Sequence, residues 1–321
     1  MTITEWNYCW PNPHFFEGPF LTGAYAALQG YNGLWFLSSA FERAKEGTLS
    51  EFNSSNNAVM RLALRAGALL YLREDVKPSL RTIAATVEGG KKAGSFLQLV
   101  SKFGIRHPPY PREGVLLASP DEKISHPSPV TGKNLEEFLQ KLKQKKVIGE
   151  NALSLKRKTA LSDTGELFLD AANEIFTVVT QRAEALLLPK KREAKGSILH
   201  VRNGSVHAAF YAGSLDGLPL PRSGRIMILH LTNLSNEGAV FRNADQSILE
   251  KQGTSRQLLY RNKAEIKLAV TGNAYTLFAC DPNGKRLFQI PFRKMEKTLS
   301  FTADNDAGSG ILLYELIRKT N

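Results

Sequence analysis

A single carboxylate, Glu5, ends a short β-branched segment near the start of the chain. Residues 2–4 read Thr-Ile-Thr, which favours a strand, and Glu5 is followed by Trp6, Asn7 and Tyr8. Ligands of parallel α/β proteins lie at the carboxyl ends of the strands. Because residues 1–40 contain no Lys or Arg, Glu5 has no neighbour in sequence for a salt bridge. A carboxylate there is suited to attack an anomeric carbon or to stabilise an oxocarbenium-like charge.

Aromatic residues surround this carboxylate in the sequence, and all three tryptophans lie within the first 35 residues. Aromatic rings stack on the CH-rich faces of sugars, so the cluster is suited to bind carbohydrate. Packing in the core and at its rim is the alternative explanation. The predicted substrate-binding residues are Trp6, Asn7, Tyr8, Trp10, His14 and Trp35.

Residues 1–75 carry a strand, helix, strand, helix pattern that would position these side chains. The expected elements are Thr2–Tyr8, Gly18–Gln29, Gly33–Leu37 and Asn57–Arg73. In the last of these, Asn57 is a capping residue and the apolar positions recur at helical spacing. A βαβα order implies parallel strands with helices outside them.

The remainder of the chain changes character. Residues 76–160 read as a connecting region that packs on a second domain, with a strand at Leu80–Val87 and a charged helix at Leu135–Lys146. Residues 161–321 consist of short alternating stretches separated by turn residues such as Asp281 to Gly284. This spacing predicts an antiparallel β-sandwich domain.

The segment Ile3-Thr4-Glu5-Trp6-Asn7 resembles the end of the seventh barrel strand in retaining glycoside hydrolases of the two-glutamate (β/α)8 superfamily. Residues 24–36 resemble the helix and eighth strand that follow, and the rest resembles the C-terminal β-sandwich of agarase-like and β-galactosidase-like enzymes. The resemblance implies that Glu5 is the catalytic nucleophile and that the ring of Trp35 forms the base of a sugar subsite. It also implies a fold in which 1–75 is the C-terminal quarter of a (β/α)8 barrel, its last two βα units, followed by the β-sandwich.

A retaining mechanism needs a second carboxyl group ~5–5.5 Å from the nucleophile as general acid. The family places it on the fourth strand, whereas this sequence matches from the seventh. Moreover, 321 residues cannot hold both a barrel of ~250 residues and a sandwich of ~100. Glu17 follows Glu5 in the sequence but is better explained as the acidic start of a helix.

The expected function is therefore that of the C-terminal portion of a glycoside hydrolase, acting on oligo- or polysaccharide by a retaining mechanism and nearly inactive alone. The alternative is a non-catalytic carbohydrate-binding or interaction module. In that case the basic runs Lys141–Lys158 and Lys190–Lys195 would contact an acidic polysaccharide.

The net charge of +12 does not indicate nucleic acid as a partner, because few aromatic residues accompany the basic runs. No apolar stretch reaches the ~18 residues of a membrane span, and the first residues lack the features of a signal peptide. We therefore expect carbohydrate as partner, no nucleic acid and no membrane, and a cytoplasmic location as the chain is written, although an intact parent could be exported. Self-association through exposed strand edges, or a missing N-terminal barrel segment, is a further expectation.

No cofactor and no metal are expected. The glycines and lysines of Gly89 to Ser95 stand in the wrong order for a phosphate-binding loop. The histidines are scattered along the chain, and His200 and His207 alternate with apolar residues as histidines of a sheet do.

Overall fold

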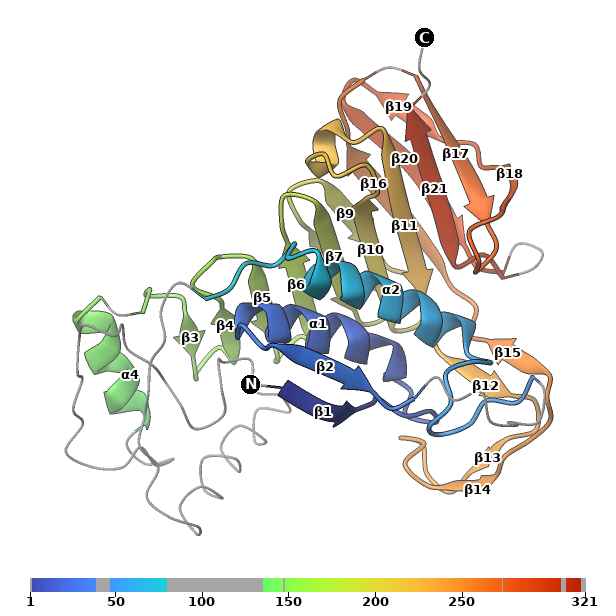
Figure 1. Cartoon of the computed structure of the whole chain (residues 1–321), viewed down its shortest axis with the longest axis horizontal. Coiled ribbons are helices and arrows are strands. Elements are labelled where there is room, and N and C mark those ends of the chain that lie inside the picture. The colour runs from blue at the N-terminus through green and yellow to red at the C-terminus, as the bar shows by residue number, and fades with distance from the viewer. Residues whose placement is uncertain are drawn as a thin grey trace.

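The structure is a computed structural model that describes residues 2–38, 47–79, 135–146, 148–272, 274–306 and 310–318. Two antiparallel sheets dominate it (Figure 1). The larger sheet has ten strands in the order β18-β17-β21-β11-β10-β7-β6-β5-β4-β3, and the smaller has five in the order β19-β20-β16-β9-β8.

The strands of the larger sheet are β3 Leu153–Ser154, β4 Thr159–Leu161, β5 Leu167–Asp170, β6 Ile175–Val179, β7 Ala183–Leu188, β10 Ala208–Ser214, β11 Arg225–Leu231, β17 Tyr275–Cys280, β18 Arg286–Gln289 and β21 Leu313–Arg318. Those of the smaller sheet are β8 Glu193–Lys195, β9 Leu199–Arg202, β16 Lys263–Ala269, β19 Arg293–Met295 and β20 Thr298–Asp304. Two short hairpin-like pairs join β12 Leu234–Asn236 to β15 Gln257–Leu259 and β13 Val240–Phe241 to β14 Leu249–Lys251.

The larger sheet is covered on both faces. On β7, Leu186 and Leu188 face the core shared with the smaller sheet, whereas Ala185 and Leu187 face a second core. Helices α1 (Gly18–Leu28) and α2 (Ala58–Leu72) close that second core, and Phe20 of α1 lies beside Tyr211 of β10 with ring centroids 6.1 Å apart. The molecule thus has a helical layer on the large sheet, opposite the smaller sheet (Figure 1).

The two helices pack on each other through glycines. A Cβ atom at Gly23 would lie 2.5 Å from the carbonyl oxygen of Gly67, and one at Gly67 would collide with the carbonyl oxygen of Pro19. Only a residue without a side chain permits this approach. The strands β1 (Thr2–Trp6) and β2 (Gly33–Phe36) pair in parallel beside the helices.

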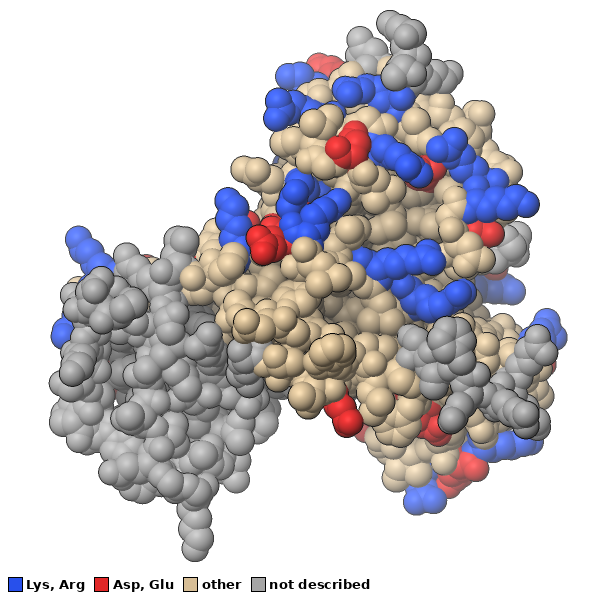
Figure 2. All heavy atoms as spheres, viewed as in Figure 1, with Lys and Arg blue, Asp and Glu red and all other residues tan. Residues whose placement is uncertain are grey.

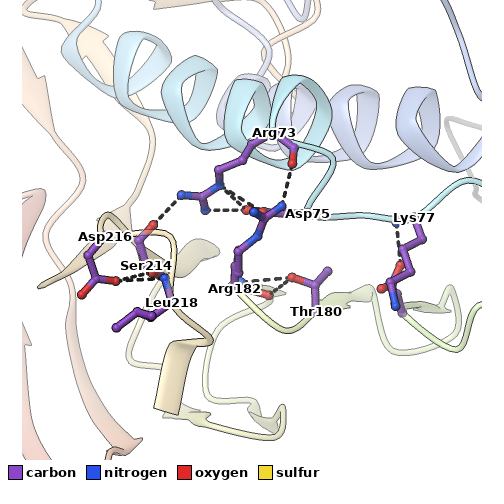
Figure 3. Close-up of polar contacts among 10 residues, drawn as sticks. Arg73, Asp75, Lys77, Thr180, Arg182, Ser214, Asp216 and Leu218 are labelled. Carbon is purple, nitrogen blue, oxygen red and sulfur yellow. Dashed lines mark hydrogen bonds and ion pairs between the residues drawn. The ribbon is translucent and has the colours of Figure 1, made fainter. Parts of the chain in front are cut away.

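A buried carboxylate fixes the end of α2 to the sheet (Figure 3). Asp75 is fully buried and accepts hydrogen bonds from Arg73, with Nε at 3.0 Å and Nη2 at 2.5 Å, and an ion pair joins it to Arg182 Nε at 2.8 Å. Arg73 also donates to the carbonyl oxygen of Ser214 at 2.5 Å. These bonds therefore fix the segment after α2 to Arg182 in the loop before β7 and to Ser214 at the end of β10.

The local elements predicted for 1–75 are present, but the prediction that they form the last quarter of a (β/α)8 barrel is wrong. The described part of the chain is dominated by antiparallel sheets, and the parallel pair β1–β2 is a separate two-stranded sheet. The helices pack on the antiparallel ten-stranded sheet and share one core with it, because α1 is apolar nearly all round and can bury more than one face.

The antiparallel two-sheet packing expected after residue 161 is present, and β3 and β4 extend the large sheet into the predicted connecting region. The predicted helix at Leu135–Lys146 corresponds to α4 (Leu135–Gln144). The predicted strand Leu80–Val87 and the segment Gly89 to Ser95 lie outside the described residues. Among the described helices, none has the length and apolar character needed to cross a membrane.

Candidate functional site

Glu5 and Trp35 lie across from each other on the parallel pair. The register passes from Ile3 opposite Leu34 to Trp6 opposite Phe36, so the pairing is irregular where the two residues Thr4 and Glu5 run alongside the single residue Trp35. Bulges redirect side chains and are frequent beside functional sites. Glu5 is exposed, and Trp35 is 63% exposed although it is one of the largest apolar side chains.

An open pocket of about 690 Å³ lies between β2 and the helices. We call it the aromatic pocket, after the five aromatic residues that line it together with small helix residues such as Gly23 and Ala68. These aromatic residues are Trp6, Tyr31, Trp35, Phe36 and Tyr71. The pocket size suits a small ligand, and its lining combines ring faces with the polar side chains of Asn32 and Glu74.

The carboxyl end of β1 is held by short contacts. The Trp6 and Phe36 rings meet edge to face with centroids 5.2 Å apart, and Asn7 Nδ2 donates to the carbonyl oxygen of Leu37 at 2.5 Å. Two atoms of this segment, Trp6 Nε1 and Asn7 Oδ1, are buried without a hydrogen-bond partner among the described residues.

Trp10 does not line the aromatic pocket, and its prediction as a substrate-binding residue is wrong. It is 2% exposed, its Nε1 donates to the carbonyl oxygen of Leu234 at 3.1 Å, and its ring meets Phe241 edge to face. Trp10 therefore fills the core between the N-terminal segment and β12. Tyr8 packs on the start of α1, against Gly18.

Glu17 lies in a second cluster, with His14 and His207. His14 Nδ1 is 2.8 Å and His207 Nε2 is 2.6 Å from Glu17 Oε1, and the two imidazole rings are perpendicular with centroids 4.6 Å apart. Burial alone would raise the pKa of Glu17, but hydrogen bonds and charge from the two histidines outweigh it and lower the pKa to about 2. Glu17 is thus a permanent anion at neutral pH and cannot donate a proton as a general acid.

This cluster changes the roles expected for two histidines. His14, predicted to contact sugar, is engaged by Glu17, and His207, predicted to be a satisfied sheet histidine, faces the same carboxylate from the residue before β10. His200 does lie within a strand, β9, where its Nε2 is 2.5 Å from Glu193.

Of the predicted site residues, Trp6 and Trp35 line the aromatic pocket, whereas Glu5 and Asn7 lie on or next to β1 and are not among its lining residues. Trp10 and His14 lie elsewhere. The contribution of Tyr31 and Tyr71 to the pocket was missed. A hydrogen bond from the Tyr71 hydroxyl to the carbonyl oxygen of Tyr31, at 2.6 Å, connects them over 40 residues of sequence. No local pattern signals such a contact.

Comparisons with known proteins found no matching family model, no matching curated protein and no matching solved structure.

Proposed function

We propose that this chain binds oligo- or polysaccharide through the aromatic pocket and the exposed ring of Trp35. The observation that carries the proposal is the 63% exposure of Trp35 at the edge of a pocket lined by four further aromatic residues. A tryptophan left in solvent forgoes a large gain from burial, about 1.5–3 kcal/mol for a large apolar side chain. Stacking on a pyranose ring would recover that gain while keeping the sugar hydroxyls in water.

The charge pattern supports stacking over attraction to an acidic polymer. On the face shown in Figure 2, Lys and Arg side chains are spread over the sandwich with acidic side chains among them. Among the described residues, Arg225 and Arg286 both form ion pairs with Glu315. A neutral sugar is thus the better partner, and its binding would depend little on ionic strength.

The binding test compares Trp35→Ala and Trp35→Phe with Phe288→Ala, since Phe288 is an aromatic residue of β18 with 48% exposure that does not line the pocket. Galacto-, gluco- and agaro-oligosaccharides are titrated against each protein by calorimetry at low and at high salt. We expect one series to bind, Trp35→Ala to weaken binding at least tenfold, and Trp35→Phe and Phe288→Ala to retain it. Absence of binding by every series, or equal binding by Trp35→Ala and Phe288→Ala, would contradict the proposal.

A retaining glycoside hydrolase reaction is the second candidate function, and the exposed carboxylate of Glu5 opposite Trp35 favours it. In that role Glu5 attacks the anomeric carbon and the sugar stacks on Trp35. Glu17 cannot protonate the leaving group, so the chain by itself would cleave ordinary glycosides very slowly. The alternative, a purely binding module, requires no role for Glu5.

An activated substrate separates these two candidates. A 2,4-dinitrophenyl 2-deoxy-2-fluoroglycoside of the sugar that binds needs no general acid, because its leaving group departs as a stable anion, and it traps the glycosyl-enzyme. If Glu5 is the nucleophile, peptide mass spectrometry will find the fluorosugar on Glu5 and not in Glu5→Gln. Binding without an adduct, or an adduct on another residue, would leave the chain a binding module.

A further inference from the structure

We propose that His14, Glu17 and His207 form a binding site for a divalent transition-metal ion of the zinc type. The three side chains each offer one ligand atom, and these atoms lie within 4.8 Å of one another. Two imidazole nitrogens and one carboxylate oxygen are a donor set that Zn²⁺ accepts, with further positions left for water or a ligand. This inference is independent of the carbohydrate proposal, because the aromatic pocket shares none of the three residues.

The backbone holds two of the ligands on one face. His14 precedes the 3-10 turn η1 (Phe15–Glu17), so His14 and Glu17 stand three residues apart, where 3-10 geometry places side chains in line. The His14 amide donates to Asn12 Oδ1 at 3.0 Å, and the Glu17 amide donates to the His14 carbonyl oxygen at 3.0 Å. Because Phe15 and Phe16 between them are fully buried, the turn is anchored in the core.

The third ligand comes from the large sheet. His207 precedes β10, a buried strand at the middle of that sheet, and its ring also lies near Phe16, with centroids 6.2 Å apart. His207 Nε2 is buried, and Glu17 Oε1 lies 2.6 Å from it. This nitrogen is therefore directed at the carboxylate that His14 also contacts, so the three ligand atoms converge.

The contacts of Glu17 Oε1 with the two imidazole nitrogens can be compared with the spacing of ligand atoms around a bound metal ion. In a tetrahedral zinc site the metal–ligand bonds of ~2.0–2.1 Å separate the ligand atoms by roughly 3.3 Å. The carboxylate oxygen is now 2.8 and 2.6 Å from the two nitrogens, so it would retreat by about half an ångström as the ion replaces a proton. Side-chain rotation of Glu17 supplies such a shift without movement of the turn.

A second pocket, of about 340 Å³, gives an ion access to the cluster. His14, Glu17 and His207 all line it, together with Tyr8, Asn12 and Glu174 among others. The side chains of His14, Glu17 and His207 are 32%, 17% and 19% exposed, so solvent still reaches each of them. Water or a small ligand in this pocket could complete the coordination shell, as at zinc sites with three protein ligands.

The test uses the full chain after treatment with EDTA and dialysis. Zn²⁺ is titrated by calorimetry, bound zinc is measured by mass spectrometry, and Co²⁺ is added to record the visible d–d spectrum of a low-coordinate site. We expect one Zn²⁺ per chain, a rise in the melting temperature with Zn²⁺, and loss of at least tenfold in affinity in His14→Ala, His207→Ala and Glu17→Gln. His200→Ala is the matched control, since His200 also pairs with a glutamate but at the surface, and it should bind Zn²⁺ as the unaltered chain does.

If His207→Ala fails to fold, His14→Ala decides the question, because His14 is the most exposed of the three ligands. The proposal is overturned if no Zn²⁺ binds at one equivalent, if His14→Ala binds it as tightly as the unaltered chain, or if His200→Ala is the variant that loses it.

Discussion

Replacing Asp75 by Asn should destabilise the protein more than any exchange at a surface ion pair. The carboxylate is fully buried between Arg73 and Arg182, whose side chains are 21% and 33% exposed. The substitution keeps the size of the side chain but removes the negative charge, so two guanidinium groups remain close together without a counter-ion. Breaking a buried ion pair by removing one partner costs about 3–5 kcal/mol.

At about 2.1 cal/mol/K of unfolding entropy per residue, a chain of 321 residues loses roughly 1.5 °C of melting temperature per kcal/mol, so Asp75→Asn should lower it by roughly 4–7 °C. The assay is thermal unfolding followed by tryptophan fluorescence, because Trp10 is buried between the N-terminal segment and β12 and reports their separation. Glu250→Gln is the control. Its partner Arg242 is 64% exposed, and the loss of such a pair should shift the melting temperature by no more than about 2 °C. Equal shifts in the two variants would refute the argument that the buried network fixes α2 to the sheet.

Two further predictions concern the buried polar and close-packed sites. Burial lowers the pKa of His230 from its ordinary value of 6.5 to about 3, so the folded protein holds this side chain neutral. The unfolded chain takes up a proton there below pH 6.5. The free energy of unfolding is therefore unaffected above pH 6.5 and decreases as the pH falls from 6.5 toward 3. At pH 4.5 this loss is roughly 3 kcal/mol, and His230→Gln should remove it from urea unfolding curves. Gly67→Ala should lower the melting temperature by several degrees, because the new Cβ collides with the Pro19 carbonyl oxygen, and Gly149→Ala, which has open space around it, should not. Unchanged acid sensitivity in His230→Gln, or equal melting temperatures for the two glycine variants, would contradict these expectations.

Local patterns predicted the elements themselves well. The helix expected at Asn57–Arg73 forms as Ala58–Leu72, and the Asn57 side chain accepts a hydrogen bond from the Met60 amide at 2.9 Å, as a capping residue does. The turn expected at Asp281 joins β17 to β18, with the Asp281 carboxylate accepting from the Asn283 and Lys285 amides. Capping and turn chemistry act over a few residues, so they can be recognised without tertiary information.

One strand of the large sheet, β7, escaped prediction. It is buried at every position and lacks the alternation of apolar and polar residues by which a half-buried strand is recognised. Its Glu184 is buried too, with its carboxylate accepting from the Ser197, Ile198 and Leu199 amides. A sequence pattern cannot explain a charged residue inside a buried strand, because the backbone amides that bind Glu184 come from a later loop and strand.

The sequence alone determined the order of helices and strands in the first 75 residues, the parallel pairing of β1 with β2 and the antiparallel character of the later sheets, since these depend on short-range patterns. It could not determine what α1 and α2 pack against. A small-residue helix that is apolar nearly all round fits a parallel barrel or an antiparallel sheet equally well, and only the tertiary structure shows that the partner is the ten-stranded sheet. That same packing buries Trp10 and brings His207 to Glu17, because contacts between distant segments arise only when whole layers come together.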